Sequence, residues 1–357
     1  MLWTVVGIAL GEGAGEGARP LPAQAGVGEP PRRQTGAVFM GYLAEMLHYH
    51  EAVPHGRFRE SRPADTGLFI VRASNSSGMS VSALVRITRP HNAVVAGLTA
   101  LLGYLIATGT LTSPSLLLAV VVVLVTAAGN VINDVYDIEI DRINRPERPI
   151  PSGEISLRGA KVYTVALFAG GIALAALTTP LCLLIALINS VILVAYAVWL
   201  KRTPVFGNIA VAYLTASIFL FGGAFAGIEG LIRNISLATI TFLATVAREV
   251  LKDAEDVDGD AAGGARTLPM IIGIQGTGVV AFACACGAVA ASILPIGDWW
   301  GLFYLIAIGF VDAVILFGAS RGLRCTTPDC VRESGATSIL RAGMFAALAV
   351  FAIAAVM

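Results

Sequence analysis

From Met79 onward, apolar runs of about 20 residues alternate with short polar connections. A run of this length crosses a bilayer as a helix, and only helices or closed barrels can satisfy every backbone polar group there. The chain has 357 residues, of which 56% are hydrophobic and 13% charged, and its mean hydropathy is +0.78. These features predict an all-α, polytopic membrane helix bundle.

We expect about nine transmembrane helices, punctuated by glycine, proline and charged residues. Their approximate bounds are Ala93–Thr108, Pro114–Val135, Lys161–Leu177, Leu181–Leu200, Asn208–Gly227, Leu231–Leu251, Gly276–Leu294, Trp299–Ser320 and Ser338–Met357.

Positive charge is distributed unevenly between the connections of these spans. Every second connection is basic, whereas the segments TGTLTS, TTP, GIEG and PIGDWWG between them contain no lysine or arginine. The positive-inside rule therefore predicts a multi-pass protein of the cell membrane, with basic connections in the cytoplasm and the C-terminus outside. The basic connections carry Arg142, Arg145, Arg148 and Arg158, then Lys201 and Arg202, then Lys252 and Arg266, then Arg321, Arg324 and Arg332. The formal net charge is zero, so nothing indicates a nucleic-acid partner.

An acidic cluster follows the second apolar run, in the stretch NVINDVYDIEIDRINRPERPIPSG from Asn130 to Gly153. If the helix continues through it, Asn133, Asp137 and Asp141 share one face, because residues four apart differ by only about 40° around the axis. Carboxylates at the edge of a bilayer need a compensating partner, which a hard divalent cation can supply. With the adjacent Asp134, these side chains are candidate Mg²⁺ ligands.

A second acidic cluster follows the sixth run, in REVLKDAEDVDGDAAGGARTLP from Arg248 to Pro269. Asp256 and Asp260 are four residues apart and Asp253 precedes Asp256 by three, so all three converge if the helix persists. Either cluster alone could be a solvated loop, but two clusters trailed by arginine weaken that interpretation. Their positions predict two four-helix pseudo-repeats around a central cavity, with a site that faces the cytoplasm.

Paired acidic clusters with nearby basic residues suit Mg²⁺-mediated binding of a phosphorylated group, and we expect two ions. Because the site opens into an apolar bundle, the rest of the substrate should be lipid. Ionisation of an allylic diphosphate would give a metal-stabilised leaving group and a carbocation shielded from water. The candidate catalytic residues are Asp137, Asp141, Asp256 and Asp260, and the candidate metal ligands are these four with Asn133, Asp134 and Asp253.

The two clusters together resemble the signatures of the UbiA superfamily of intramembrane prenyltransferases. NDVYDIEIDRINRPERPIPSG resembles the first, an Asn-x-x-x-Asp-x-x-x-Asp pattern, and KDAEDVDGD resembles the second. The likeness extends from about Val85 to the C-terminus. It implies Mg²⁺-dependent transfer of a prenyl group from a prenyl diphosphate to an acceptor, in a cavity open sideways to membrane lipids.

One feature departs from the family pattern, in which Tyr-x-x-x-Lys often follows the fourth span. Here Tyr196 and Lys201 are five residues apart, a rotation of about 140° if the helix continues, so the two need not share a face. The candidate diphosphate-binding residues are Lys201, Arg202, Arg145, Arg148, Lys252 and Arg266. The alternative for Arg145 and Arg148 is a simple topology signal, and for Arg202 a side chain that snorkels to the interface. Asn92, Tyr196 and Asn208 are candidate cavity-lining residues, with a helix cap as the alternative for Asn92 and an interfacial anchor for Tyr196.

The acceptor is less well defined by the sequence. The second cluster is similar to that of archaeal family members that place a geranylgeranyl group on geranylgeranylglyceryl phosphate in ether-lipid synthesis. Geranylgeranylglyceryl phosphate is therefore the acceptor we favour. An aromatic acceptor on a quinone pathway, such as 4-hydroxybenzoate or a naphthoate, fits the same scaffold. The sequence defines neither the general base nor the oligomeric state.

Two alternatives belong to other classes, transport and lipid binding, and a third is another membrane enzyme. A cation transporter would place its acids near the bilayer midplane, whereas these acids lie at span ends. A polyprenyl phosphate-binding protein would bind diphosphate without releasing pyrophosphate. A transferase acting on nucleotide-activated alcohols would carry its acids in one continuous motif.

The first 78 residues differ in composition from the rest of the chain. They are rich in glycine, proline and arginine and contain no run long enough to cross a bilayer, so we expect an irregular extension before a membrane domain at 79–357. The alternative is that the natural start lies at Met79. Cys325 and Cys330 share a short polar loop and could pair only in an oxidising compartment.

Overall fold

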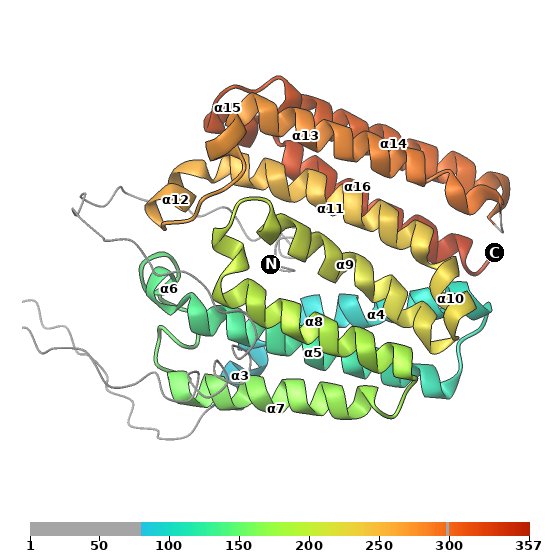
Figure 1. Cartoon of the computed structure of the whole chain (residues 1–357), viewed down its shortest axis with the longest axis horizontal. Helices are drawn as coiled ribbons and strands as arrows, with labels where there is room; N and C mark the ends of the chain where they lie inside the picture. The colour runs from blue at the N-terminus through green and yellow to red at the C-terminus, as the bar shows by residue number, and fades with distance from the viewer. Residues whose placement is uncertain (1–79, 298–299) are drawn as a thin grey trace, which may run out of the picture.

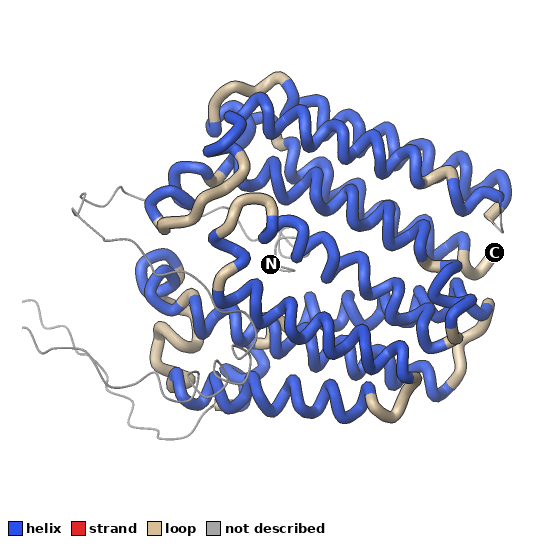
Figure 2. The backbone as a smooth tube through the Cα atoms, in the orientation of Figure 1, coloured by secondary structure: helices blue, strands red, loops and turns tan. Residues whose placement is uncertain are grey.

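The computed structural model describes residues 80–297 and 300–357. Within these two ranges every regular element is a helix (Figure 2). The predicted N-terminal extension, residues 1–78, lies outside the described residues.

Nine of the described helices have 19 or more residues, in agreement with the nine expected spans. They are α4 (Pro90–Thr108), α5 (Leu116–Tyr136), α7 (Leu157–Ala175), α8 (Pro180–Val198), α9 (Phe206–Phe225), α11 (Ile235–Glu255), α13 (Pro269–Ala291), α14 (Gly301–Leu323) and α16 (Ala336–Ala354). The short helices are α3 (Val81–Ile87), α6 (Ile138–Asn144), α10 (Ile228–Arg233), α12 (Val257–Ala262) and α15 (Pro328–Ser334), with 3-10 turns η1 (Ser113–Ser115), η2 (Leu200–Arg202) and η3 (Leu294–Gly297).

Eight of the nine long helices are apolar and long enough to cross a membrane. The ninth, α11, carries five charged residues in its last eight positions and packs against α9, α13 and α16 inside the bundle. The chain is therefore a multi-pass membrane protein whose most polar long helix is shielded by its neighbours.

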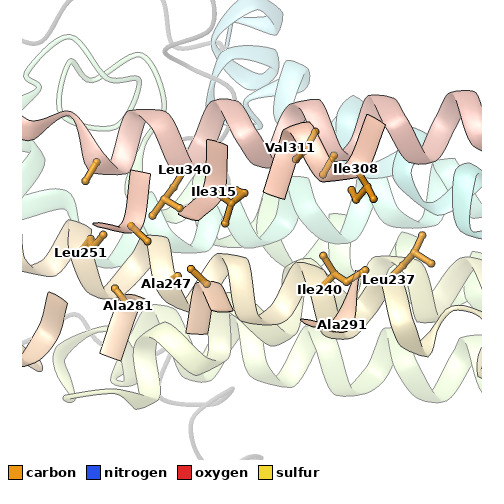
Figure 3. Close-up of a cluster of buried hydrophobic side chains, with 14 of the residues drawn as sticks. Leu237, Ile240, Ala247, Leu251, Ala281, Ala291, Ile308, Val311, Ile315 and Leu340 are labelled. Carbon is orange, nitrogen blue, oxygen red and sulfur yellow. The ribbon is translucent and has the colours of Figure 1, made fainter. Parts of the chain in front are cut away.

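The helices run roughly parallel to one another, and the short helices α6, α12 and α15 lie at one end of the bundle (Figure 1). We call this the acidic end, because α6 and α12 carry the two acidic clusters; α10 lies at the opposite end. In the first half α5 packs against α4, α7 and α8, and α9 joins this half to α11. Figure 3 shows part of the core of the second half, where α11 meets α14 and α16 through Leu251, Ile315 and Leu340.

Glycines allow the helices that join the two halves to approach closely. A Cβ at Gly222 of α9 would lie 2.2 Å from the carbonyl oxygen of Ala100 in α4, and one at Gly223 would lie 2.3 Å from that of Gly230 in α10. The backbones are thus in contact where only glycine fits. This contact fixes the position of α9, whose first turn contributes to the candidate site.

Some helix bounds differ from those expected. The expected span Leu231–Leu251 is divided into α10 and α11 at Asn234, whose amide donates hydrogen bonds to the carbonyls of Gly103 and Gly230, both at 3.0 Å. The helix expected at Gly276 begins at Pro269 and is broken at Gly273, where φ is 76°. A buried side-chain contact and a positive φ angle, rather than hydrophobicity, determine these two boundaries.

The expectation of one continuous helix through each acidic cluster needs correction. α5 ends at Tyr136 and α11 ends at Glu255, and the next residue in each case, Asp137 or Asp256, joins the long helix to a short one. Both junction residues have similar backbone angles, φ −95° and ψ 5° for Asp137 and φ −102° and ψ 9° for Asp256. The two halves therefore share a local motif, a long helix, an aspartate at a kink and a short helix, as a pseudo-repeat predicts.

Candidate active site

The first acidic cluster is built on the kink between α5 and α6. Backbone hydrogen bonds continue across it, because Asp137 N donates to Asn133 O at 2.9 Å and Asp141 N donates to Asp137 O at 2.8 Å. The Asn133 amide also donates to the Asp137 carboxylate at 2.8 Å, and Lys201 from η2 forms an ion pair with Asp137. The kink thus places Asn133, Asp137 and Lys201 in one cluster.

Two arginines hold the other carboxylates of this cluster. Arg148 donates to Asp141 at 2.5 Å and to Asp134 at 3.2 Å, and Arg89 forms a second ion pair with Asp134. Asp141 and Asp134 are buried, and burial raises the pKa of the Asp141 carboxyl while Arg148 opposes that shift. The NRPERP segment therefore folds back onto the acidic cluster through Arg148.

The second acidic cluster repeats this geometry with different partners. Asn208, in the first turn of α9, donates to Asp253 at 2.8 Å, and Lys252 lies 3.4 Å from Asp256. Burial raises the pKa of Asp260 to about 6, and the charge of Asp256 adds to the shift. Burial and a neighbouring carboxylate thus disfavour the ionised form of Asp260, as in other sites where acids lie close together.

Tyr196 and the turn between α8 and α9 connect the two clusters. Tyr196 interacts electrostatically with Asp137 of the first cluster and with Asp253 and Asp260 of the second. On the turn, Lys201 contacts the first cluster and Asn208 contacts the second. The structure therefore brings both clusters and this turn into one polar site.

A tight bend makes this turn possible. Phe206 N donates to Pro204 O at 2.8 Å, and Val205 between them has φ 68°, an unusual backbone conformation for a β-branched residue. α8 ends at Val198, so the 140° rotation expected between Tyr196 and Lys201 does not apply. Burial lowers the pKa of Lys201, while Asp137 opposes that shift.

Other candidate residues are less closely engaged. Arg202 is exposed, and its carbonyl accepts a hydrogen bond from Arg266 N at 3.1 Å. Arg145 follows α6 and is half-buried. Asn92 is fully buried, and neither atom of its amide has a hydrogen-bond partner among the described residues.

Two apolar cavities lie deeper in the bundle, away from the acidic end. The larger lies between α4, α9, α11, α13, α14 and α16, and the smaller between α5, α8 and α9. Ile218 of α9 lines both cavities, so this helix separates them. Asn92, Tyr196 and Asn208, expected to line a cavity, line neither of these two.

The donor set fits Mg²⁺ in its chemistry, since both clusters offer carboxylate oxygens and the first adds an amide oxygen. Within the described ranges, however, no three acidic, histidine or cysteine side chains form a preformed metal site. In the first cluster Lys201 and Arg148 form ion pairs with Asp137 and Asp141. Metal binding there would require these cations to move, whereas Asp256 and Asp260 are held less tightly.

Sequence reasoning missed three charged residues near this site. Arg89, which precedes the first apolar run and was not among the candidates, pairs with Asp134. Arg248 of α11 is fully buried in an ion pair with Glu249, and Arg341 of α16 is 6% exposed. Arg248 and Arg341 lie within apolar runs of the sequence. A charged residue in such a run needs a partner, and this could have marked both as candidates.

The fold and the site define a polytopic membrane protein with two aspartate clusters at one end of its helix bundle. Residues 96–334 match the UbiA prenyltransferase family. A digeranylgeranylglyceryl phosphate synthase from Methanoculleus marisnigri is 81% identical over 278 residues, which are 78% of this chain and 100% of that protein. The chain therefore belongs to the UbiA prenyltransferase family.

Solved structures agree with this assignment. A structure from work on digeranylgeranylglyceryl phosphate synthase in membranes has a TM-score of 0.70 at 34% identity, and the match covers 77% of this chain and 98% of that one. A UbiA homologue from Archaeoglobus fulgidus, bound to GPP and Mg²⁺, has a TM-score of 0.52 at 20% identity, covering 75% of this chain and 99% of that one. The second likeness concerns the fold alone.

Proposed function

We propose that this prenyltransferase moves a geranylgeranyl group from geranylgeranyl diphosphate to the free hydroxyl of geranylgeranylglyceryl phosphate, in archaeal ether-lipid synthesis. The hydroxyl oxygen bonds to the allylic carbon, pyrophosphate leaves, and the hydroxyl proton is lost. The observation that carries the proposal is the convergence of two aspartate clusters on one polar site above apolar cavities. The 81% identity to a digeranylgeranylglyceryl phosphate synthase supports this choice of acceptor.

We assign the diphosphate to the polar site, held by two Mg²⁺ ions. The ligands would be Asn133, Asp137, Asp141, Asp253, Asp256 and Asp260. When bound, the metal would stabilise the charge of the departing pyrophosphate. The Mg²⁺ in the A. fulgidus homologue supports a metal of this kind.

The basic residues have separate proposed roles. Lys201 and Arg148 contact carboxylates in this structure and would turn to diphosphate oxygens when metal takes their place. Asp134 accepts from both Arg89 and Arg148, so we assign it to holding these arginines rather than to the metal. Arg145, Arg202, Lys252 and Arg266 are the remaining candidates for diphosphate binding.

We also propose that residues 79–357 form the catalytic unit and that the acidic end faces the cytoplasm. The first proposal is supported by a relative whose entire length aligns with 278 residues of this chain. The second is supported by the arginines and lysines of the connections at that end.

The test is transfer of labelled geranylgeranyl diphosphate by the purified chain, offered geranylgeranylglyceryl phosphate or 4-hydroxybenzoate in parallel. We expect label only in the first acceptor, and loss of transfer on chelation of Mg²⁺, in Asp137→Ala and in Asp256→Ala. Asp329→Ala is the matched control, because Asp329 is exposed and its ion-pair partner is the exposed Arg332.

Two results would contradict the proposal. Transfer to 4-hydroxybenzoate alone would move the protein to a quinone pathway. Absence of both products and of pyrophosphate release would favour lipid binding or transport.

A further inference from the structure

We propose that Arg341 of α16 and Asn92 of α4 form a binding site for the phosphate of the acceptor lipid, at the acidic end of the larger cavity. This inference rests on the proposed function, because an acceptor with its own phosphate needs an anion site separate from the diphosphate site.

Helical periodicity places Arg341 above the larger cavity. Met344, Phe345 and Leu348 of α16 line that cavity, and Arg341 precedes them by three, four and seven residues. Residues at these spacings share one helix face. α16 begins at the acidic end, after α15 (Figure 1). Arg341 is in the second turn of α16 and precedes its cavity-lining residues, so it lies on the side of the cavity nearer that end.

Asn92 has the same relation to the cavity on α4. Val95, Ala96 and Thr99 line the cavity and follow Asn92 by three, four and seven residues. α4 also begins at the acidic end, since the next long helix, α5, ends there. Two helices that border the same cavity thus each present a polar residue one turn above its apolar lining.

Both side chains have unused hydrogen-bonding capacity. Asn92 is 0% exposed and neither amide atom has a partner, and the buried Nε of Arg341 also has none among the described residues. Buried polar atoms without partners are unfavourable and rare in native proteins. A phosphate, which accepts several hydrogen bonds, would satisfy both the guanidinium and the amide N–H groups.

One further guanidinium and two carboxylates surround Arg341. Arg341 interacts electrostatically with Arg248, Glu249 and Glu255. Both carboxylates already accept from other donors, since Arg248 pairs with Glu249 and Thr337 donates to Glu255 at 2.7 Å. Among the described residues no hydrogen bond or ion pair joins Arg341 to either carboxylate, so its guanidinium remains able to bind a phosphate.

The position also suits the reaction. On α11, Arg248 precedes Asp253 by five residues and Asp256 by eight, which correspond to rises of about 8 and 12 Å. The acceptor's phosphate and its reactive hydroxyl are on adjacent carbons. A phosphate held near Arg248 and Arg341 would leave the hydroxyl free to extend toward the diphosphate site.

The two cavities then account for two lipid chains. The larger cavity, below Arg341 and Asn92, would take the acceptor chain. The smaller lies below the first acidic cluster, since Thr126 lines it and precedes Asn133 by seven residues on α5. It would take the first part of the donor chain, with Ile218 of α9 between the two.

The test measures transfer by the full chain to geranylgeranylglyceryl phosphate and to geranylgeranylglycerol, which lacks the phosphate. We expect Arg341→Gln to raise the KM for the phosphorylated acceptor by about 10- to 100-fold, the loss typical of one hydrogen bond between charged groups. The KM for geranylgeranyl diphosphate should be unchanged, and the preference for the phosphorylated acceptor should disappear. Arg341→Lys should restore part of that preference.

The control is Arg324→Gln, which removes the same charge from an exposed position at the C-terminal cap of α14. Asn92→Asp adds a negative charge beside the phosphate and should weaken the preference for the phosphorylated acceptor. This second variant provides the test if Arg341→Gln does not fold. An unchanged preference in the folded variants, or an equal rise in both KM values, would overturn this inference alone. If the wild type transfers to neither glycerol acceptor, the proposed function fails as well.

Discussion

Arg148 and Arg89 show how single side chains make the first acidic cluster possible. Asp134 has a side chain only 5% exposed and accepts from both arginines, and Arg148 also reaches Asp141. A buried carboxylate is stable only when its charge is compensated. The arginines therefore supply ion-pair partners for two acids at the edge of an apolar bundle.

This arrangement predicts that Arg89→Ala strongly destabilises the fold. Removing Arg89 leaves Asp134 buried with one partner, and breaking a buried pair costs about 3–5 kcal/mol. Thermal unfolding in detergent should show a clear fall in Tm. Arg86→Ala is the matched control, because its pair with Glu154 is exposed and should contribute only about 0–1 kcal/mol. Equal effects of the two variants would contradict the argument.

Among the helices, α9 connects the two acidic clusters. Its first turn brings Asn208 to Asp253, the turn before it brings Lys201 to Asp137, and its later glycines pack against α4 and α10. Displacing α9 would therefore disturb the fold and the site together.

Close packing predicts that Gly222→Ala destabilises the protein by about 1–3 kcal/mol, the usual result of overpacking. The added Cβ would lie 2.2 Å from Ala100 O and 2.9 Å from Tyr104 N, both of them backbone atoms that cannot rotate away. Gly309→Ala in α14 is the control, because a Cβ there meets nothing within 4 Å and should stabilise the helix by up to about 1 kcal/mol. A lower Tm for Gly309→Ala than for Gly222→Ala would contradict this account.

For the whole molecule, both acidic clusters lie at one end of the bundle, together with the basic connections (Figure 1). The same end carries the Cys325–Cys330 disulfide, whereas Cys182, Cys284 and Cys286 are free. Thiols in the cytoplasm are usually kept reduced. The orientation and the redox state of this pair can therefore be tested together.

We expect a cysteine at Glu147 to react with a membrane-impermeant maleimide only from the cytoplasmic side, and one at Thr110 only from outside. Both positions are exposed, Glu147 at the acidic end and Thr110 between α4 and α5. The measurement compares maleimide labelling of right-side-out and inverted vesicles, both containing the chain with its native cysteines replaced. The reverse pattern would place the acidic end outside, where the disulfide would be expected.

The sequence alone was sufficient to predict a membrane helix bundle and to locate an acidic cluster after the second and after the sixth apolar run. Both depend on local properties, the length of an apolar run and the spacing of Asn133, Asp137 and Asp141 along one helix. Local spacing did not reveal the kinks at Asp137 and Asp256, because hydrogen bonds between residues four apart continue across both of them.

Only the tertiary structure decided which residues meet across the bundle. Arg89 and Asp134 are 45 residues apart, as are Asn208 and Asp253, and Lys201 and Asp137 are 64 apart. No periodicity spans such separations, since the first pair depends on how α4 packs against α5 and the other two on where α9 and the turn before it lie. The sequence determined which chemical groups are available, and helix packing determined which of them share a site.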